Sequence, residues 1–281
     1  MSKSTPSEFY YHAHGTAISG AITRPVSHVI DTIASTALPI SGGAASAAAG
    51  NTIHSHPQLG NIVSCKSASA QVAGSLNNTD GRHTTLVTVT VEGLNVLDTV
   101  TADRIVMKLS AHHHPSEEEG HFIPLGSHFD NLKIAGHPVK VELDHELFST
   151  CDTYADFKQR YQSDAAFRKR VRKQFLWGDY DADTPQFLKD RFQWHTGKDT
   201  PPESKGLVPC TVVKSVQHDQ PNVLKTYGNV IIVPQFGKVF LGELNLKSGT
   251  RHLTMLRLEL GSPVAGSMSI VGGGGNGTTW P

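Results

Sequence analysis

The chain has few cysteines, no excess of either charge and no long apolar run. Its three cysteines are odd in number and widely spaced, which fits neither a disulfide framework nor a zinc knuckle and predicts reduced thiols. The 25 basic residues balance the 25 acidic ones, so no overall field attracts nucleic acid or an anionic membrane. No stretch approaches the roughly 18 apolar residues of a membrane span, and residues 1–11 contain no apolar signal region. We therefore expect a cytoplasmic protein, with leaderless export as an open alternative.

The common nucleophile and phosphate-binding motifs are also missing. The sequence contains no Gly-x-Ser-x-Gly elbow, no Gly-x-x-x-x-Gly-Lys-Ser/Thr loop and no Gly-x-Gly-x-x-Gly segment that opens a helix. Gly272 to Gly275 only imitates a phosphate loop, because no helix follows whose N-terminus could hold an anion. The usual nucleotide-binding folds are therefore not expected.

What the sequence does contain is period-two alternation, the mark of strands with one buried face. It is clearest at 86–91, where Val87, Val89 and Val91 share a face, and it returns at 103–109, after a turn-like link at 92–95. Near the C-terminus it marks 237–244 and 256–260. Weaker candidates lie at 10–22, 62–76, 129–143, 208–216, 229–233 and 264–271.

One segment breaks this pattern. Between 153 and about 194, aromatic and aliphatic residues fall at helical spacing and predict three helices, with Ser163 as cap of the second and a third helix at 184–194. The remainder reads as strands without intervening helices, which predicts a mainly β protein: an antiparallel β-sandwich or barrel with a helical insert. The expected divisions are 1–150 and 207–271 for the β domain, 151–206 for the insert and its linker, and a flexible Gly-rich tail at 272–281. The Gly/Ala/Ser run at 41–50 favours a loop over a small-residue strand.

Histidine is unusually frequent, with 16 residues and local clusters at 12/14, 54/56 and 112–114. Residues i and i+2 of a strand face the same way, so His12 and His14 could chelate a divalent metal with a third ligand. Our nominees for such a site are His12, His14 and His145, with Glu146 as base. The alternative interpretation is that these are ordinary surface histidines. The cupin pattern fails, because Ala17 or Ile18 stands where a cupin has its glutamate.

A dense basic patch lies in the second expected helix. It could contact phosphate, an acidic partner or the aspartates 179, 181 and 183 of a neighbouring copy, or it could simply be a solvated helix face. The residues that we nominate for interaction are Arg168, Lys169, Arg170, Arg172, Lys173 and Trp177.

Three short segments resemble the choice-of-anchor P family of bacterial β-rich surface or secreted proteins. They are His14-Gly-Thr-Ala-Ile-Ser-Gly20, Gly93-Leu-Asn-Val-Leu97 with Val100-Thr-Ala-Asp103, and the run from Phe129 to Val139. The resemblance implies a β-rich fold and no catalytic residues.

Together these features predict a non-catalytic structural or interaction protein that self-assembles as a homo-oligomer or filament. The alternative is a metal-dependent hydrolase or oxygenase that uses clustered histidines on a β scaffold. A third hypothesis, a lectin-like binding module, would need an exposed aromatic platform, which three Trp and six Tyr neither show nor exclude.

Overall fold

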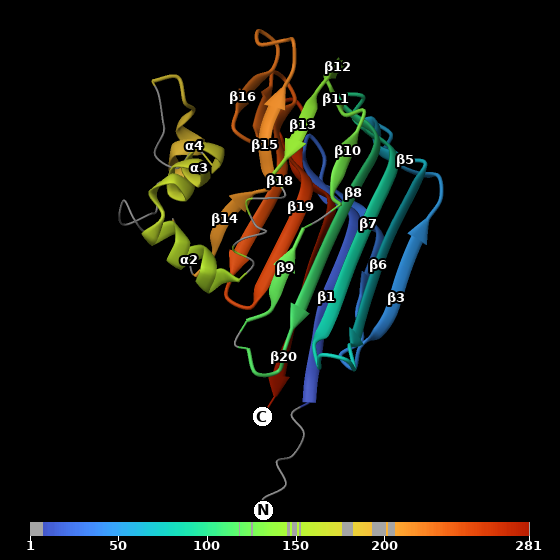
Figure 1. Cartoon of the computed structure of the whole chain (residues 1–281). Coiled ribbons are helices and arrows are strands. Elements are labelled where there is room, and N and C mark those ends of the chain that lie inside the picture. The colour runs from blue at the N-terminus through green and yellow to red at the C-terminus, as the bar shows by residue number, and fades with distance from the viewer. Residues whose placement is uncertain are drawn as a thin grey trace, which may run out of the picture.

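The computed structural model describes residues 8–117, 119–124, 126–144, 147, 151, 153–175, 182–192, 201 and 206–280. Two large antiparallel sheets and one small ladder account for the strands in these ranges. Figure 1 shows β1 and β20 running behind β7 and β8, and across the interior β7 contacts both β1 and β20 while β8 contacts β20. The chain is thus a two-layer β-sandwich with a helical insert, which is one of the two architectures, sandwich or barrel, that the sequence predicts.

The first sheet brings the two ends of the chain together. The N-terminal strand pairs with the last one from Glu8–Trp280 to Arg24–Ala265. The order along the sheet is β16 (Lys225–Tyr227), β17 (Val230–Val233), β18 (Gly237–Lys247), β19 (Thr250–Leu260), β20 (Ala265–Trp280), β1 (Glu8–Arg24) and β2 (His28–Ala37), and β14 (Val208–Thr211) pairs with β18.

The second sheet is built on the long hairpin of β7 and β8. Its main path is β12 (His137–Pro138), β11 (Lys133–Ile134), β8 (Val100–His113), β7 (His83–Val96), β5 (Gly60–Cys65) and β4 (Thr52–His56). β9 (His121–Ile123) and β10 (His128–Asp130) also pair with β8, β6 (Ser67–Leu76) pairs with β7, and β3 (Gly43–Ala49) pairs with β6. A separate ladder joins β13 (Lys140–Leu143) to β15 (Val213–Gln217).

The core lies between the two large sheets. Val87, Val89 and Val91 are fully buried on the inner face of β7, as the alternation predicts. The hairpin turn is not at 92–95, because β7 continues to Val96 and pairs there with Val100. Leu97 and Asp98, with φ of 49° and 51°, form the turn, since this left-handed geometry matches the twist of the flanking strands.

The insert contains three described helices: α2 (Tyr154–Ser163), α3 (Ala165–Phe175) and α4 (Gln186–Phe192). Thr153 caps α2 by accepting a hydrogen bond from the backbone N–H of Asp156 at 3.0 Å. Asp164 caps α3 through the backbone N–H of Phe167 at 2.9 Å, so the prediction of Ser163 as this cap is wrong. Ser163 is instead the last residue of α2. No helix of the described residues is long and apolar enough to cross a membrane.

Two small-residue segments were expected to be irregular and are strands. Residues 43–49 form β3, and residues 272–280 belong to β20, so the predictions of a loop and of a flexible tail are both wrong. The reason is backbone pairing with distant partners: β3 pairs along its length with β6, and β20 is hydrogen-bonded on both sides, to β1 and to β19. Glycine is also required at Gly273, where a Cβ would lie 2.8 Å from Cε of Met107 in the opposite sheet.

Candidate functional site

The outer edge of β3 is open within the described part of the chain. The strand contains only glycine, alanine and serine, and in the described part of the chain it pairs with β6 alone. Its register with β6 runs without a bulge from Gly43–Gly74 to Ala49–Ala68. Natural edge strands are usually protected from pairing by charge, proline or bulges. This edge has none of these protections.

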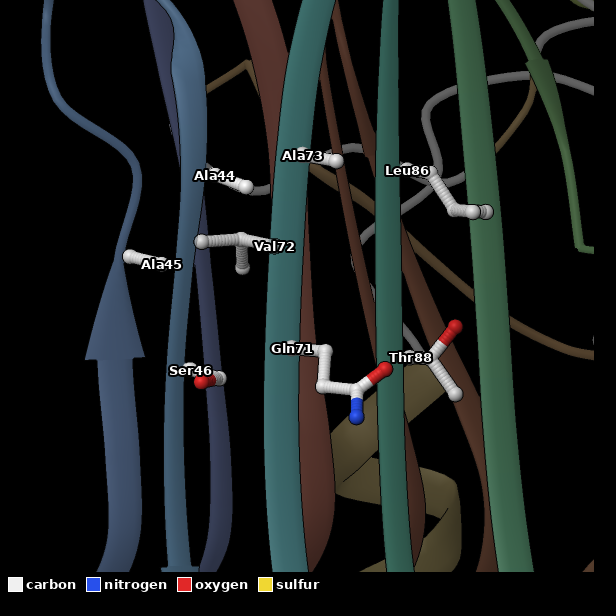
Figure 2. Close-up of a pocket in the computed structure, with 8 residues that line it drawn as sticks. All are labelled: Ala44, Ala45, Ser46, Gln71, Val72, Ala73, Leu86 and Thr88. Atoms are coloured by element: carbon white, nitrogen blue, oxygen red, sulfur yellow. The ribbon is translucent and has the colours of Figure 1, made fainter.

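The exposed face beside this edge is shallow and uncharged. A hollow of about 320 Å³ lies over β3, β6 and β7, and its lining consists of Ala44, Ala45, Ser46, Gln71, Val72, Ala73, Leu86 and Thr88. Figure 2 shows Ser46, Gln71 and Thr88 on three neighbouring strands, where they form one cross-strand row. Because the alanines are small, the exposed side chain of Leu86 borders a depression.

The structure brings one of the nominated metal ligands together with a histidine that the sequence pattern did not identify. His12 and His14 both lie on the exposed face of β1, as their spacing predicts. His14 lies beside His252 of β19, with ring centroids 5.6 Å apart, and Gly274 of β20 separates the two strands. A Cβ at Gly274 would lie 3.3 Å from His14 and 3.5 Å from His252. The missing side chain is what lets the two imidazoles approach.

Both imidazoles of this pair favour the neutral form. His14 is exposed at the surface, yet the atoms packed around its ring partly desolvate it and so lower its pKa. Burial, followed by the charge of His14, lowers the pKa of His252. His145 and Glu146 lie outside the described residues. Within the described residues no group of three or more His, Cys, Asp or Glu side chains could hold a metal ion. The three-ligand site therefore remains a prediction, and His14 with His252 is the pair that the fold assembles.

The histidine run at 112–114 ties the two sheets together at one end of the sandwich. The ring nitrogens of His113 lie 3.1 Å from the carbonyl oxygen of Gly277 and 2.9 Å from that of Glu117. Nearby, the ring of His83 stacks on Phe9 at 3.8 Å. Burial lowers the pKa of His83, with smaller contributions from His113 and His114. These contacts give the cluster a structural role.

The nominated basic patch is divided between internal contacts and the surface. Arg168 donates to the carbonyl oxygens of Tyr161 and Gln162, at 2.8 and 3.0 Å, where α2 ends. Arg170 forms an ion pair with Asp144, which is buried.

The remaining nominated residues of α3 differ in exposure. Lys169 and Lys173 are exposed and Arg172 is partly buried. Trp177 lies outside the described residues. The patch is therefore not a uniform solvated face, because Arg168 joins α3 to the end of α2 and Arg170 binds the buried Asp144.

The fold and these surfaces define a class: a two-sheet antiparallel β protein with a helical insert, an unprotected edge strand and no described three-ligand metal centre. A family model described as a domain of unknown function, DUF8256, matches residues 9–247. Because the match covers most of the chain, the protein belongs to this family. No curated protein and no solved structure matches the chain in the same comparisons.

Proposed function

We propose that this protein is a non-catalytic structural or interaction protein that assembles with copies of itself. The observation that carries the proposal is the unprotected edge of β3. An edge strand presents a row of backbone N–H and C=O groups, and an identical strand supplies the complementary row. The family match assigns no activity, and the resemblance to the choice-of-anchor P family remains a prediction.

The sequence of β3 suits antiparallel pairing about a two-fold axis. Its seven residues are centred on Ser46, so in a symmetric pair Ser46 would face the partner's Ser46, and Ala44 would face Ala48. The side chains of all three are exposed and small, so they do not hinder the approach of a second strand.

Apolar surface beside the edge would add to the interface. Val29 on β2 and Ile40 in the link from β2 to β3 are 69% and 57% exposed. β2 contacts β3, and Ile40 lies three residues before the first residue of β3. The chain also has a formal net charge of zero, which removes the general repulsion that keeps many proteins monomeric.

Charge substitution at Ser46 tests the proposal. In a symmetric pair, Ser46→Lys places like charges directly opposite each other, which destabilises a cross-strand pair. We expect Ser46→Lys and Ser46→Glu each to be monomeric by size-exclusion chromatography with light scattering, at concentrations where the unsubstituted protein assembles. An equimolar mixture of the two variants should assemble again, because the opposing charges then attract.

Gln71→Lys is the matched control. Gln71 is exposed and pairs with Ser46 in register, but it lies one strand inward from the edge. Edge pairing predicts that this control assembles like the unsubstituted chain. If the unsubstituted protein is a monomer of 30.3 kDa at all concentrations, or if the mixture fails to assemble, the proposal is wrong. Loss of assembly in Gln71→Lys alone would point to stacking of the outer faces instead.

We also propose a cytoplasmic location. All three cysteines are buried thiols, and burial raises the pKa of Cys65 and of Cys210. Such thiols suit a reducing compartment, where disulfides are rare. Cell fractionation, with the untagged protein detected by antibodies, would test this location. Recovery of the protein in the extracellular fraction would refute the proposal.

A further inference from the structure

A pocket of about 420 Å³ lies between the helical insert and the β-strands. Arg170, Lys173 and Gln174 of α3 line one side of it. β15 lines another side through residues that include Val213 and Val216. The volume falls in the range of about 300–1,000 Å³ that is typical of small-molecule sites. The pocket is well removed in sequence and in sheet position from the β3 edge, so it is independent of the proposed assembly.

The charges around this pocket leave an excess of positive charge. Asp144 is the carboxylate in the lining, and Arg170 already pairs with it. Lys214 also lines the pocket, and its ammonium group binds Glu142 at 2.6 Å. Lys173 is exposed and forms no ion pair within the described part of the chain. One cation of the lining is therefore available to a ligand.

Buried hydrogen bonds hold the polar side of the pocket in place. The carboxylate of Asp144 accepts hydrogen bonds from the backbone N–H of Leu147 at 2.9 Å, from Nε2 of Gln174 at 2.9 Å and from Arg170. Asp144 is 3% exposed, so these bonds are shielded from water. The side chain of Arg170 nevertheless remains 45% exposed, and it carries further N–H donors beyond the one that reaches Asp144. Asp144 thus orients a guanidinium group that can still contact a ligand.

We infer that this pocket binds a small organic anion, with its oxyanion held by Lys173 and Arg170 and its apolar part packed against the valines of β15. Arginine and lysine together suit carboxylate or phosphate oxygens, since hydrogen bonds between charged groups are about twice as strong as neutral ones. Val216 is partly exposed and Val213 is buried, so β15 presents aliphatic surface to the pocket beside Lys214 and Ser215. Carboxylates and phosphate monoesters share the required chemistry.

The test uses the full-length protein and fluorinated probes observed by ¹⁹F NMR. The probes are 4-fluorobenzoate, 4-fluorophenyl phosphate and the neutral 4-fluorobenzyl alcohol. We expect at least one anionic probe to bind with a Kd below about 1 mM, and the alcohol to bind much more weakly. The anionic probe with the lower Kd shows whether the pocket prefers a carboxylate or a phosphate.

Two lysine variants on the same helix show whether the binding occurs in this pocket. Lys173→Gln should weaken the anionic probe by about tenfold, because it removes one charge-assisted contact. Lys169→Gln removes the same charge from an exposed position outside the lining and should leave the Kd unchanged. Equal melting temperatures of the two variants would show that both retain the fold. If Lys173→Gln unfolds, Val216→Asp is the second test, because its carboxylate should repel the anionic probe and weaken its binding. Absence of binding at about 10 mM, equal binding of the alcohol, or equal loss in both lysine variants would overturn the inference.

Discussion

Replacement of a single glycine in β20 tests whether the last residues of the chain are a packed strand. A Cβ added at Gly273 would lie 2.6 Å from the carbonyl oxygen of His14 and 2.8 Å from Cε of Met107. The carbonyl belongs to the backbone of the neighbouring strand β1, which cannot move away without disturbing its own pairing. Gly273→Ala therefore overpacks the interior.

The neighbouring position provides the control. A Cβ at Gly272 would lie 3.4 Å from its nearest atoms, the side-chain oxygens of Ser269 and Thr254, which is an ordinary contact. Gly272→Ala should therefore be neutral, or stabilising by up to about 1 kcal/mol, because alanine loses less backbone entropy on folding. The two glycines are neighbours in the sequence, but a side chain added at one would lie on the opposite face of the strand from a side chain added at the other.

The magnitude follows from overpacking of a well-packed interior, which costs about 1–3 kcal/mol. For a domain of this size, 1 kcal/mol corresponds to a change in Tm of about 2–4 °C. We expect Gly273→Ala to lower Tm by several degrees in circular dichroism melts and to lower the urea midpoint, while Gly272→Ala does neither. Equal stability of the two variants would refute the packing that we describe for β20.

Two further predictions concern acid and the helical insert. Desolvation lowers the pKa of His14 and of His252 below the ordinary 6.5, so as the pH falls the unfolded chain binds protons before the folded one. The free energy of unfolding should therefore fall as the pH drops below about 6.5. In urea titrations between pH 7.5 and 5, His252→Gln should reduce this fall. Phe157 is fully buried, and its ring centroid lies 5.9 Å from that of Phe167. Phe157→Ala should lower the free energy of unfolding by about 3–5 kcal/mol. Gln159→Ala, on the exposed side of α2, should change the urea midpoint little.

Part of the site was predictable because it depends on local geometry. His12 and His14 share a face of β1 since alternate residues of any strand do so. The basic character of α3 likewise follows from its residues. The partners of these residues were not predictable: His252 lies more than two hundred positions from His14 in the chain, and only the placement of β20 between β1 and β19 brings the two rings together. Likewise, nothing in the sequence around Asp144 indicates that this residue is buried or that it forms an ion pair with Arg170.

The sequence by itself determined the β class, the inner faces of β7 and β8, and the position of the three helices of the insert. These features rest on the periodicity of apolar residues, which is local to each segment. Only the tertiary structure decided that the glycine and alanine runs are strands. Such residues have no strong preference of their own, and their conformation depends on backbone hydrogen bonds to β6, β1 and β19, which are distant in the chain. The same long-range pairing places β3 at the edge of its sheet within the described part of the chain, and the assembly that we propose rests on this position.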